Sequence, residues 1–331
     1  MPLSHNANLD PNALNIKKLE QVPTRNGYGE GLVAAARKDE RIVALCADLT
    51  ESTRTDGFRD EFPERFFNIG VAEQNLTTVA AGLAQYGKIP FIASYAMFSP
   101  GRAWEQVRTT ICYNNVPVKI VGAHAGVSVG PDGATHQAIE DIAIMRTIPK
   151  MNVVVPCDTN EGRKAVIAAA KIDEPFYLRF TREKTPVFTT TDTNFEIGRA
   201  EIFFDNKDPE VAIIGCGPVL HNAMLAASEL EQDGIRVRVI NNHTIKPLDE
   251  DTIVAAARDA GAVVTVEEHQ VMGGMGSAVA ECLARECPVP IEFIGVQDRF
   301  GESGEPNELI EHFGMGKDAI VLAVRKVLKR K

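Results

Sequence analysis

Apolar residues along the chain fall into short runs that alternate with longer amphipathic or alanine-rich segments. The short runs of the first half predict buried strands, over residues 41–49, 90–95, 118–124 and 152–158. The longer segments predict helices, over residues 30–38, 73–86, 102–113, 136–146 and 160–171. Strands that alternate with helices of about 10–15 residues are typical of crossover units and a parallel sheet.

The alternation is interrupted once, by a polar, threonine-rich stretch near residue 190. It then restarts, and predicts strands over residues 210–217, 236–242, 262–268 and 291–296 and helices over residues 221–232, 249–259, 277–285 and 318–329. We therefore expect two consecutive doubly wound, mainly parallel α/β domains. They cover residues 21–187 and 198–331, with an N-terminal arm over residues 1–20 and a linker over residues 188–197.

Length and composition narrow the class of protein. A chain of 331 residues is long enough for two domains that each bury a core. It has no run of 18 or more apolar residues and no apolar stretch typical of a secretory signal, so we expect neither a membrane span nor export. The net charge of −10 argues against nucleic acid as the main partner. Six scattered cysteines without metal-ligand spacing are typical of a reducing compartment, so we expect a cytoplasmic protein with no metal ligands of its own.

Candidate chemistry gathers after the predicted strands of the first domain. In open parallel sheets, ligands bind beyond the carboxyl ends of the strands. The segments that follow these strands, with one longer loop, are residues 47–52, 68–75, 94–98, 122–126 and 130–137. We therefore expect carboxylates, two aromatic residues, two histidines and several glycines to converge on one edge of one sheet.

Taken singly, these residues have ordinary structural roles. An acidic residue in a first helical turn, such as Glu73, interacts favourably with the helix dipole. Aromatic residues such as Tyr95 and Phe98 usually belong to the core. A glycine-rich turn such as residues 273–276 serves close packing as often as phosphate binding. Function is therefore indicated by the order and spacing of the whole set.

Three segments together resemble the transketolase family: GVAEQNLTTVAAGLA, SYAMFSPGRAWEQVR and GAHAGVSVGPDGATHQAIEDIAIMRTIPKMNVVVPCD. The resemblance extends from about Arg25 to the C-terminus. It implies a thiamine-diphosphate pyrimidine-binding domain over residues 21–187 and a transketolase C-terminal domain over residues 198–331. The implied reaction is transfer of a two-carbon ketol unit from a ketose phosphate to an aldose phosphate, as in the pentose phosphate pathway.

The resemblance also implies roles for individual residues around the cofactor. Glu73 matches the carboxyl group that hydrogen-bonds N1′ of the aminopyrimidine and thereby promotes loss of the C2 proton. Tyr95 and Phe98 match the aromatic wall against which that ring packs, and Asp48 matches an aspartate near the cofactor.

A second set matches the sugar-phosphate channel. His136 corresponds to a catalytic histidine that contacts the donor ketose near the reacting carbons, and Asp132 to an aspartate that binds an adjacent hydroxyl group. The residues that match the grip on the terminal phosphate are Arg25, Ser52, His124 and Arg182. Two arginines with a hydroxyl and an imidazole donor suit a dianion.

The sequence departs from the family pattern at several points. Gly101 stands where single-chain transketolases have a third aromatic residue, and Ala134 and Ala138 stand where they have proline. The Gly-Asp-Gly motif that holds Mg²⁺ and the diphosphate is missing from this sequence. We therefore expect Mg²⁺ and the diphosphate to be held by a separate N-terminal transketolase subunit, in an α₂β₂ assembly.

Four alternatives remain open. Deoxyxylulose-phosphate synthase shares an acidic residue and a similar DG-x-TH loop, and 2-oxoacid dehydrogenase beta subunits share the helix but lack the GPDGATHQ loop. A dinucleotide-binding oxidoreductase is suggested by Gly215 and Gly217 after a strand, although the third glycine is absent. A non-catalytic regulatory subunit would have no need of Glu73, His136 and the phosphate cluster.

Overall fold

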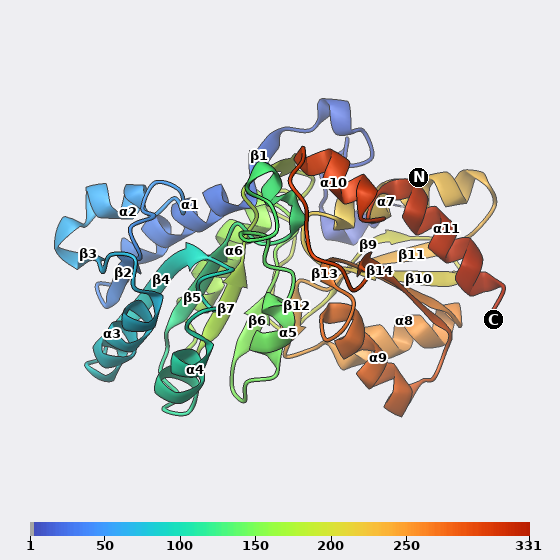
Figure 1. The fold of residues 1–331 in the computed structure, drawn as a ribbon. Coiled ribbons are helices and arrows are strands. Elements are labelled where there is room, and N and C mark those ends of the chain that lie inside the picture. Colours follow the sequence, from blue (N-terminus) through green and yellow to red (C-terminus); the bar gives the residue numbers. More distant parts are fainter. Residues whose placement is uncertain (1–2) are drawn as a thin grey trace.

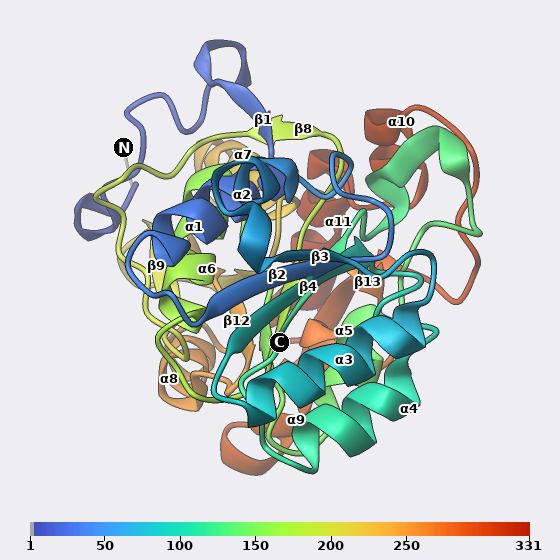
Figure 2. The same cartoon turned by 90° about the vertical axis from the view of Figure 1, so that its left-hand side faces the viewer.

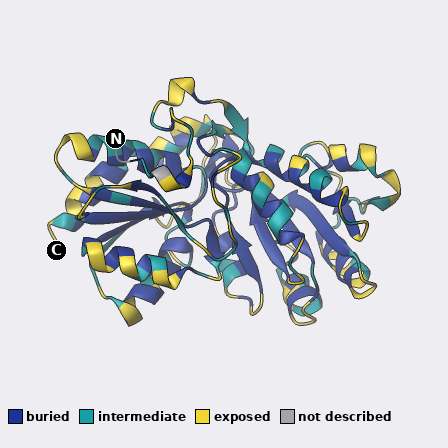
Figure 3. Ribbon diagram, turned by 180° about the vertical axis from the view of Figure 1, so that it is seen from behind, coloured by how far each residue is buried: buried dark blue, intermediate teal, exposed yellow. Residues whose placement is uncertain are grey.

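The computed structural model describes residues 3–331 and contains two α/β domains side by side (Figure 1). Each layer has a largely parallel sheet with helices on both faces, as the sequence pattern predicts. Strands are buried, whereas the helices expose their outer faces (Figure 3). No helix within residues 3–331 has both the length and the apolar character needed to cross a bilayer.

The first sheet has seven strands. In spatial order they are β12 (Thr244–Lys246), β6 (Asn152–Val154), β7 (Phe176–Arg179), β5 (Lys119–Ala123), β4 (Ile89–Tyr95), β2 (Ile42–Cys46) and β3 (Phe66–Asn68). All pairs are parallel except that of β12 with β6. Because β12 comes from the second half of the chain, the two halves share one sheet, which the sequence pattern did not predict.

Helices cover both faces of this sheet (Figure 2). One face carries α1 (Thr24–Ala36), α2 (Asp56–Glu61) and α6 (Thr159–Ala169). The other carries α3 (Glu73–Gln85), α4 (Trp104–Gln106) with the π-helical turn η4 (Val107–Cys112), and α5 (Asp141–Arg146). Where β5 ends, the chain forms the irregular 3₁₀ segment η5 (Val127–Asp132), which is kinked at Gly130.

The second sheet has five strands, β14 (Ile291–Val296), β13 (Val263–Gln270), β10 (Val211–Gly215), β11 (Val237–Asn241) and the antiparallel β9 (Glu201–Asp205). Its helices are α7 (Leu220–Gln232), α8 (Glu250–Ala260), α9 (Met275–Glu286), α10 (Pro306–His312) and α11 (Lys317–Leu328). The chain runs from β10 to β11 and then crosses back to β13 on the other side of β10. The strand order therefore reverses direction between β10 and β13.

The N-terminal segment packs on the second domain, although it precedes the first. Within residues 3–20 the only regular structure is two 3₁₀ turns, η1 (His5–Ala7) and η2 (Ile16–Lys18). Ala7 and Ala13 are buried in the core of the second domain, and the Ser4 N–H donates to the Phe203 carbonyl at 3.0 Å. Beyond it, β1 (Gln21–Pro23) pairs with β8 (Lys184–Pro186) as a short antiparallel ribbon.

Helix α1 begins six residues before the start predicted from the sequence at residue 30. The prediction failed because three glycines lower helix propensity at this point. Tertiary packing requires two of them: a Cβ on Gly27 would lie 2.1 Å from the Thr159 carbonyl oxygen, and one on Gly31 would lie 2.9 Å from the Arg163 carbonyl oxygen. The glycines let α1 approach α6 closely.

The helix predicted over residues 136–146 begins only at Asp141. The residues before Asp141 form a turn, an isolated bridge from Ala138 to Ala125 and a bend, and the Gln137 side chain makes contacts elsewhere. Gln137 Nε2 donates to the carbonyls of Val127 at 2.9 Å and of Glu302, in the second domain, at 2.8 Å. These bonds tie a loop of the first domain to the second domain.

The polar segment over residues 188–197 is anchored by a buried carboxylate. Asp158 caps the N-terminus of α6 by accepting the Glu161 N–H at 3.0 Å. It also accepts hydrogen bonds from the backbone N–H groups of Phe188 and Thr189, at 3.0 and 2.7 Å, and from the Thr189 hydroxyl at 2.8 Å. Phe188 itself is fully buried. The segment therefore starts in order, held by Asp158 of the first domain while Phe188 packs in the core of the second.

We expect Asp158→Ala to lower the free energy of unfolding by about 3 kcal/mol, because it removes a helix cap and leaves buried N–H groups without an acceptor. Asp192→Ala, an exposed position in the same segment, should change it by less than about 0.5 kcal/mol. Urea denaturation followed by circular dichroism measures both variants. Equal midpoints for Asp158→Ala and the wild type would show that the carboxylate does not anchor the segment.

Candidate functional site

Two adjoining pockets lie beyond the carboxyl ends of β2, β4 and β5. One, of about 260 Å³, is lined by Asp48, Glu73, Tyr95, Phe98 and His136, with Arg102. The other, of about 470 Å³, is lined by Arg25, Ser52, His124, Asp132 and Arg182, with Arg54. Tyr95 lines both, so the pockets are neighbouring parts of one site. The structure thus brings together every site residue that the sequence predicted.

Glu73 lies at the closed end of the first pocket. It is the first residue of α3, and its side chain is only 2% exposed. The Arg102 guanidinium donates to Oε2 of Glu73 at 2.9 Å and also lies 5.0 Å from the centre of the Phe98 ring. Within the described residues 3–331, no other side chain donates to this carboxylate. One carboxylate oxygen therefore remains available for a ligand.

An aromatic wall stands beside Glu73. The Tyr95 and Phe98 rings are stacked with their centres 6.1 Å apart, and the edge of the His136 ring meets Phe98 at 5.4 Å. Gly101 leaves no room for a further aromatic ring, since a Cβ there would lie 2.1 Å from the Met97 carbonyl oxygen. A flat heteroaromatic ring that needs a carboxylate partner fits this pocket.

Asp48 lies at the rim of the same pocket rather than inside it. The residue is exposed, has a left-handed backbone with φ of 59°, and lies two residues beyond the end of β2. Its side chain accepts a hydrogen bond from Asn68 Nδ2 at 2.9 Å, while its own N–H donates to Asn68 Oδ1 at 3.1 Å. This reciprocal pair fixes the turn and the direction of the carboxylate.

Three arginines converge on the second pocket, and Glu51 and Asp132 also line it. Arg25 Nη1 donates to the Ser52 carbonyl at 2.7 Å and to Nε2 of His124 at 3.1 Å. Burial, together with the charges of Arg54 and Arg182, lowers the pKa of Arg25. Nε of Arg25 and Nδ1 of His124 are buried, and neither has a hydrogen-bond partner within residues 3–331. Such unpaired donors suit an anionic ligand.

His124 is held neutral in this pocket. It stacks on Tyr95 with the ring centres 3.9 Å apart. Burial, and then the charges of Arg25 and Arg182, lower its pKa to about 3. Because Nε2 accepts from Arg25, the ring hydrogen of the neutral imidazole is on Nδ1. His124 can therefore donate one hydrogen bond without adding a charge.

Arg182 and Asp132 form an ion pair at the edge of the same pocket. Arg182 Nη1 lies 3.1 Å from Asp132 Oδ2 and also donates to the Val129 carbonyl at 3.2 Å. Asp132 therefore lines the second pocket, which we call the anion pocket, whereas His136, four residues later, lines the pocket that contains Glu73. One loop, over residues 126–137, contributes to both pockets.

Sequence reasoning missed two arginines of this site. Arg54 lines the anion pocket with a left-handed backbone, φ 65°, and its Nε donates to Asn26 Oδ1 at 3.0 Å. Backbone strain of this kind at a non-glycine residue often marks a functional position. Arg102 was missed because only the fold brings it to Glu73. The available signal was position: Arg54 is two residues after Ser52 on the same loop.

Two other sequence features have structural roles. The glycine-rich turn before α9 is filled by Glu267, whose carboxylate accepts the N–H groups of Met275 and Gly276 at 2.7 and 2.8 Å. The turn after β10 does not form a dinucleotide site either: where a ribose-binding acid would be required, Asn241 donates to Glu161 at 2.6 Å.

Within residues 3–331, no cluster of three histidine, cysteine or acidic side chains could hold a metal ion. All six cysteines are free.

Two domain families match most of the chain. The transketolase pyrimidine-binding domain matches residues 20–187, and the transketolase C-terminal domain matches residues 198–320. Similar structures include one described as a split gene transketolase, inactive beta4 tetramer. It is 46% identical, with a TM-score of 0.87, and the match covers 93% of this chain and 99% of that chain.

Curated relatives give the same result. The 6-deoxy-6-sulfo-D-fructose transketolase subunit SqwH of Clostridium sp. is 41% identical over 95% of this chain and 97% of its own length. Human transketolase is 35% identical over 97% of this chain but 51% of its own length, so the chain spans about half of that relative. With both domain matches and these identities, the chain belongs to the transketolase family.

Proposed function

We propose that this chain is the C-terminal subunit of a two-chain transketolase that depends on thiamine diphosphate. In the proposed reaction it transfers a two-carbon ketol unit from a ketose phosphate to an aldose phosphate, as in the pentose phosphate pathway. One observation carries the proposal. The pocket that holds the buried Glu73 carboxylate and the aromatic wall adjoins a pocket lined by three arginines, and Tyr95 lines both pockets. A site for a heteroaromatic cofactor and a site for an anionic sugar tail are thus continuous.

The residues around Glu73 would hold the aminopyrimidine of the cofactor. When bound, thiamine diphosphate supplies a carbon nucleophile that cleaves and forms bonds next to a carbonyl group. Glu73 would hold a proton at N1′ of the pyrimidine, since its carboxylate is buried and has one oxygen without a protein donor. Tyr95 and Phe98 would pack against the ring, and Asp48 would close the rim. Arg102 would have to share Glu73 with the ring or release it.

The second pocket would hold the terminal anion of the sugar. Arg25, Arg54 and Arg182 supply positive charge, while Ser52 and His124 are placed among them. His136 would contact the donor sugar near the cofactor, and Asp132 would bind a hydroxyl group farther along. Phosphate is the terminal anion that we propose. The name of the Clostridium relative indicates that a related subunit acts on a sugar with a sulfonate in that position.

The proposal requires a partner chain. The Gly-Asp-Gly motif is missing from this sequence, so Mg²⁺ and the diphosphate would be held by an N-terminal transketolase subunit. We propose an α₂β₂ heterotetramer, because family active sites lie between domains of different subunits. The description of one similar structure as an inactive beta4 tetramer of a split gene transketolase supports partner dependence. Six free cysteines are in keeping with a cytoplasmic location.

Reconstitution tests the proposed function. The chain alone should not turn over xylulose 5-phosphate with ribose 5-phosphate, whereas the chain mixed with its N-terminal partner, thiamine diphosphate and Mg²⁺ should. The mixture should release no carbon dioxide from pyruvate with glyceraldehyde 3-phosphate. Turnover by the isolated chain would refute the split site, and carbon dioxide release would assign the protein to the synthase class.

Glu73→Gln should lower kcat at least about 10²-fold in the reconstituted enzyme, because glutamine keeps the size but cannot exchange a proton with N1′. Hydrogen–deuterium exchange at C2 of the bound cofactor should slow in parallel. Glu105→Gln, at an exposed position in α4, is the matched control and should retain both rates. Unchanged C2 exchange in Glu73→Gln would exclude Glu73 as the activating carboxyl group.

Arg182→Ala should raise KM for phosphorylated sugars by about 10–150-fold, which corresponds to a charge-assisted hydrogen bond of about 1.5–3 kcal/mol. The phosphate contact persists from ground state to transition state, so kcat should fall much less. We expect the same direction for Arg54→Ala.

Hydroxypyruvate, which has no phosphate, should keep its KM in both arginine variants. Arg199→Ala removes an exposed arginine outside the pocket and controls for charge. A similar rise in KM for phosphorylated sugars and for hydroxypyruvate would instead indicate damage to the fold or to the subunit contact.

A further inference from the structure

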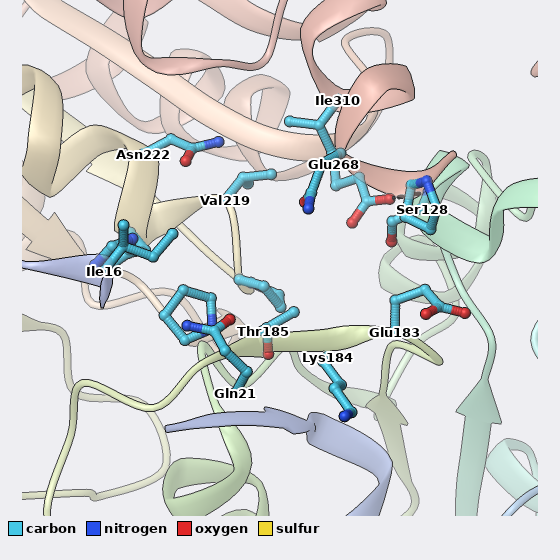
Figure 4. A pocket seen from close by; sticks show the side chains of 15 residues that line it. Ile16, Gln21, Ser128, Glu183, Lys184, Thr185, Val219, Asn222, Glu268 and Ile310 are labelled. Carbon is cyan, nitrogen blue, oxygen red and sulfur yellow. Dashed lines mark hydrogen bonds between the residues drawn. The ribbon is translucent and has the colours of Figure 1, made fainter. Parts of the chain in front are cut away.

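A further pocket, of about 110 Å³, lies between the two domains, with Ser128 and Glu183 of the first and Glu268 of the second in its lining, and none of its residues has a role in the proposed reaction (Figure 4). It is at the carboxyl ends of β10 and β13, where the strand order of the second sheet reverses direction. Open α/β sheets bind ligands at such a crevice. Three other segments complete its walls: the N-terminal arm, the β1–β8 ribbon and α10.

The carboxylate of Glu268 is the polar centre of this pocket. Glu268 is on β13, is only 3% exposed, and points its carboxylate into the pocket in Figure 4. Within residues 3–331, Ser128 is the only residue that donates to this carboxylate, through its N–H to Oε1 at 2.7 Å. The Glu268 carboxylate therefore faces the pocket with Ser128 as its one donor residue among residues 3–331.

Among residues 3–331, no lysine, arginine or histidine forms an ion pair with the Glu268 carboxylate. Arg179 is the nearest candidate, but it pairs with Asp141, with Nε 2.7 Å from Oδ2, and reaches Glu268 only at its backbone carbonyl. Burial raises the pKa of Glu268, and Arg179 offsets this only in part. A buried carboxylate that has no ion-pair partner is stabilised by a cation that can reach it.

The other polar side chains of the pocket include a second carboxylate, Glu183, and the amides of Gln21, Asn222 and Asn307, which can both donate and accept. Asn222 uses its Nδ2 to donate to the Met315 carbonyl at 3.1 Å, which leaves its oxygen free. The Thr185 hydroxyl donates to the Val22 carbonyl at 3.2 Å and can accept a further bond. The Lys184 ammonium group points away from the pocket in Figure 4. Apolar wall comes from side chains such as Ile16, Val219 and Ile310.

We propose that this pocket binds a small primary ammonium ion with a short apolar body. The ammonium group would donate to Oε2 of Glu268 and to neighbouring oxygens, while the apolar part would contact Val219 and Ile310. A dry cavity of about 150 Å³ holds benzene, so this volume suits a ligand of about four or five heavy atoms. Glu268 also holds Ser128 at the start of the loop that contributes to both reaction pockets.

Three probes of similar shape test the proposal on the full chain without cofactor or partner: n-propylammonium, 1-propanol and propionate, at constant ionic strength. Saturation-transfer NMR and calorimetry should show saturable binding of propylammonium, at least about tenfold weaker binding of propanol, and none of propionate. Equal binding of propylammonium and propanol, preference for propionate, or no saturable binding would overturn the proposal. None of these outcomes depends on transketolase activity, so they leave the proposed function untouched.

Two variants assign the binding to this pocket. Glu268→Gln keeps an acceptor for the Ser128 N–H but removes the charge, and should weaken propylammonium binding at least about tenfold. Ile310→Phe narrows the pocket without touching the carboxylate and should weaken it as well. Glu286→Gln, which removes an exposed carboxylate, is the control. Wild-type affinity in both pocket variants would show that the ammonium ion binds elsewhere and would overturn the proposal.

Discussion

A buried ion pair between Arg179 and Asp141 lies where the first domain contacts the second. Arg179 ends β7, Asp141 begins α5, and both side chains are almost completely buried with Nε 2.7 Å from Oδ2. Burial raises the pKa of Asp141, but Arg179, His269 and Tyr177 outweigh it and keep the pKa below its usual value. Arg179 also donates to the Glu268 carbonyl of β13 at 2.9 Å. Loss of one partner would leave an uncompensated charge, which typically costs about 3–5 kcal/mol.

The second domain therefore contacts the loop over residues 126–137, which lines both candidate pockets. That loop is irregular, and it contributes Asp132 and His136 to two different pockets. It is held from the side of the second domain by Glu268 at Ser128 and by the Glu302 carbonyl at Gln137. A site that depends on such support gains precision, because its side chains are placed by a rigid neighbour rather than by the loop.

The sequence pattern predicted part of the strands and few of the side-chain partners, and it predicted no strand at β3, β7, β9 or β12. Short apolar runs identified β2, β4 and β5, and the rule that ligands lie beyond their carboxyl ends located the site. Local pattern could not reveal that Gly27 serves the close approach of two helices, or that Gln137 is used by the second domain. Arg102 was missed for the same reason, since its contact with Glu73 joins residues 29 positions apart.

In the anion pocket, a neutral histidine, His124, lies beside the charged Arg25. If His124 were protonated beside Arg25, the two cations would repel at 3.1 Å, and the imidazole could not accept the arginine's hydrogen bond. A folded pKa of about 3, against an ordinary value of 6.5, avoids this. The sign of its effect on stability follows: as pH falls from about 6.5 towards 3, the unfolded chain binds the proton more readily, and stability is lost. The neutral imidazole that orients Arg25 therefore lowers the stability of the fold at acidic pH.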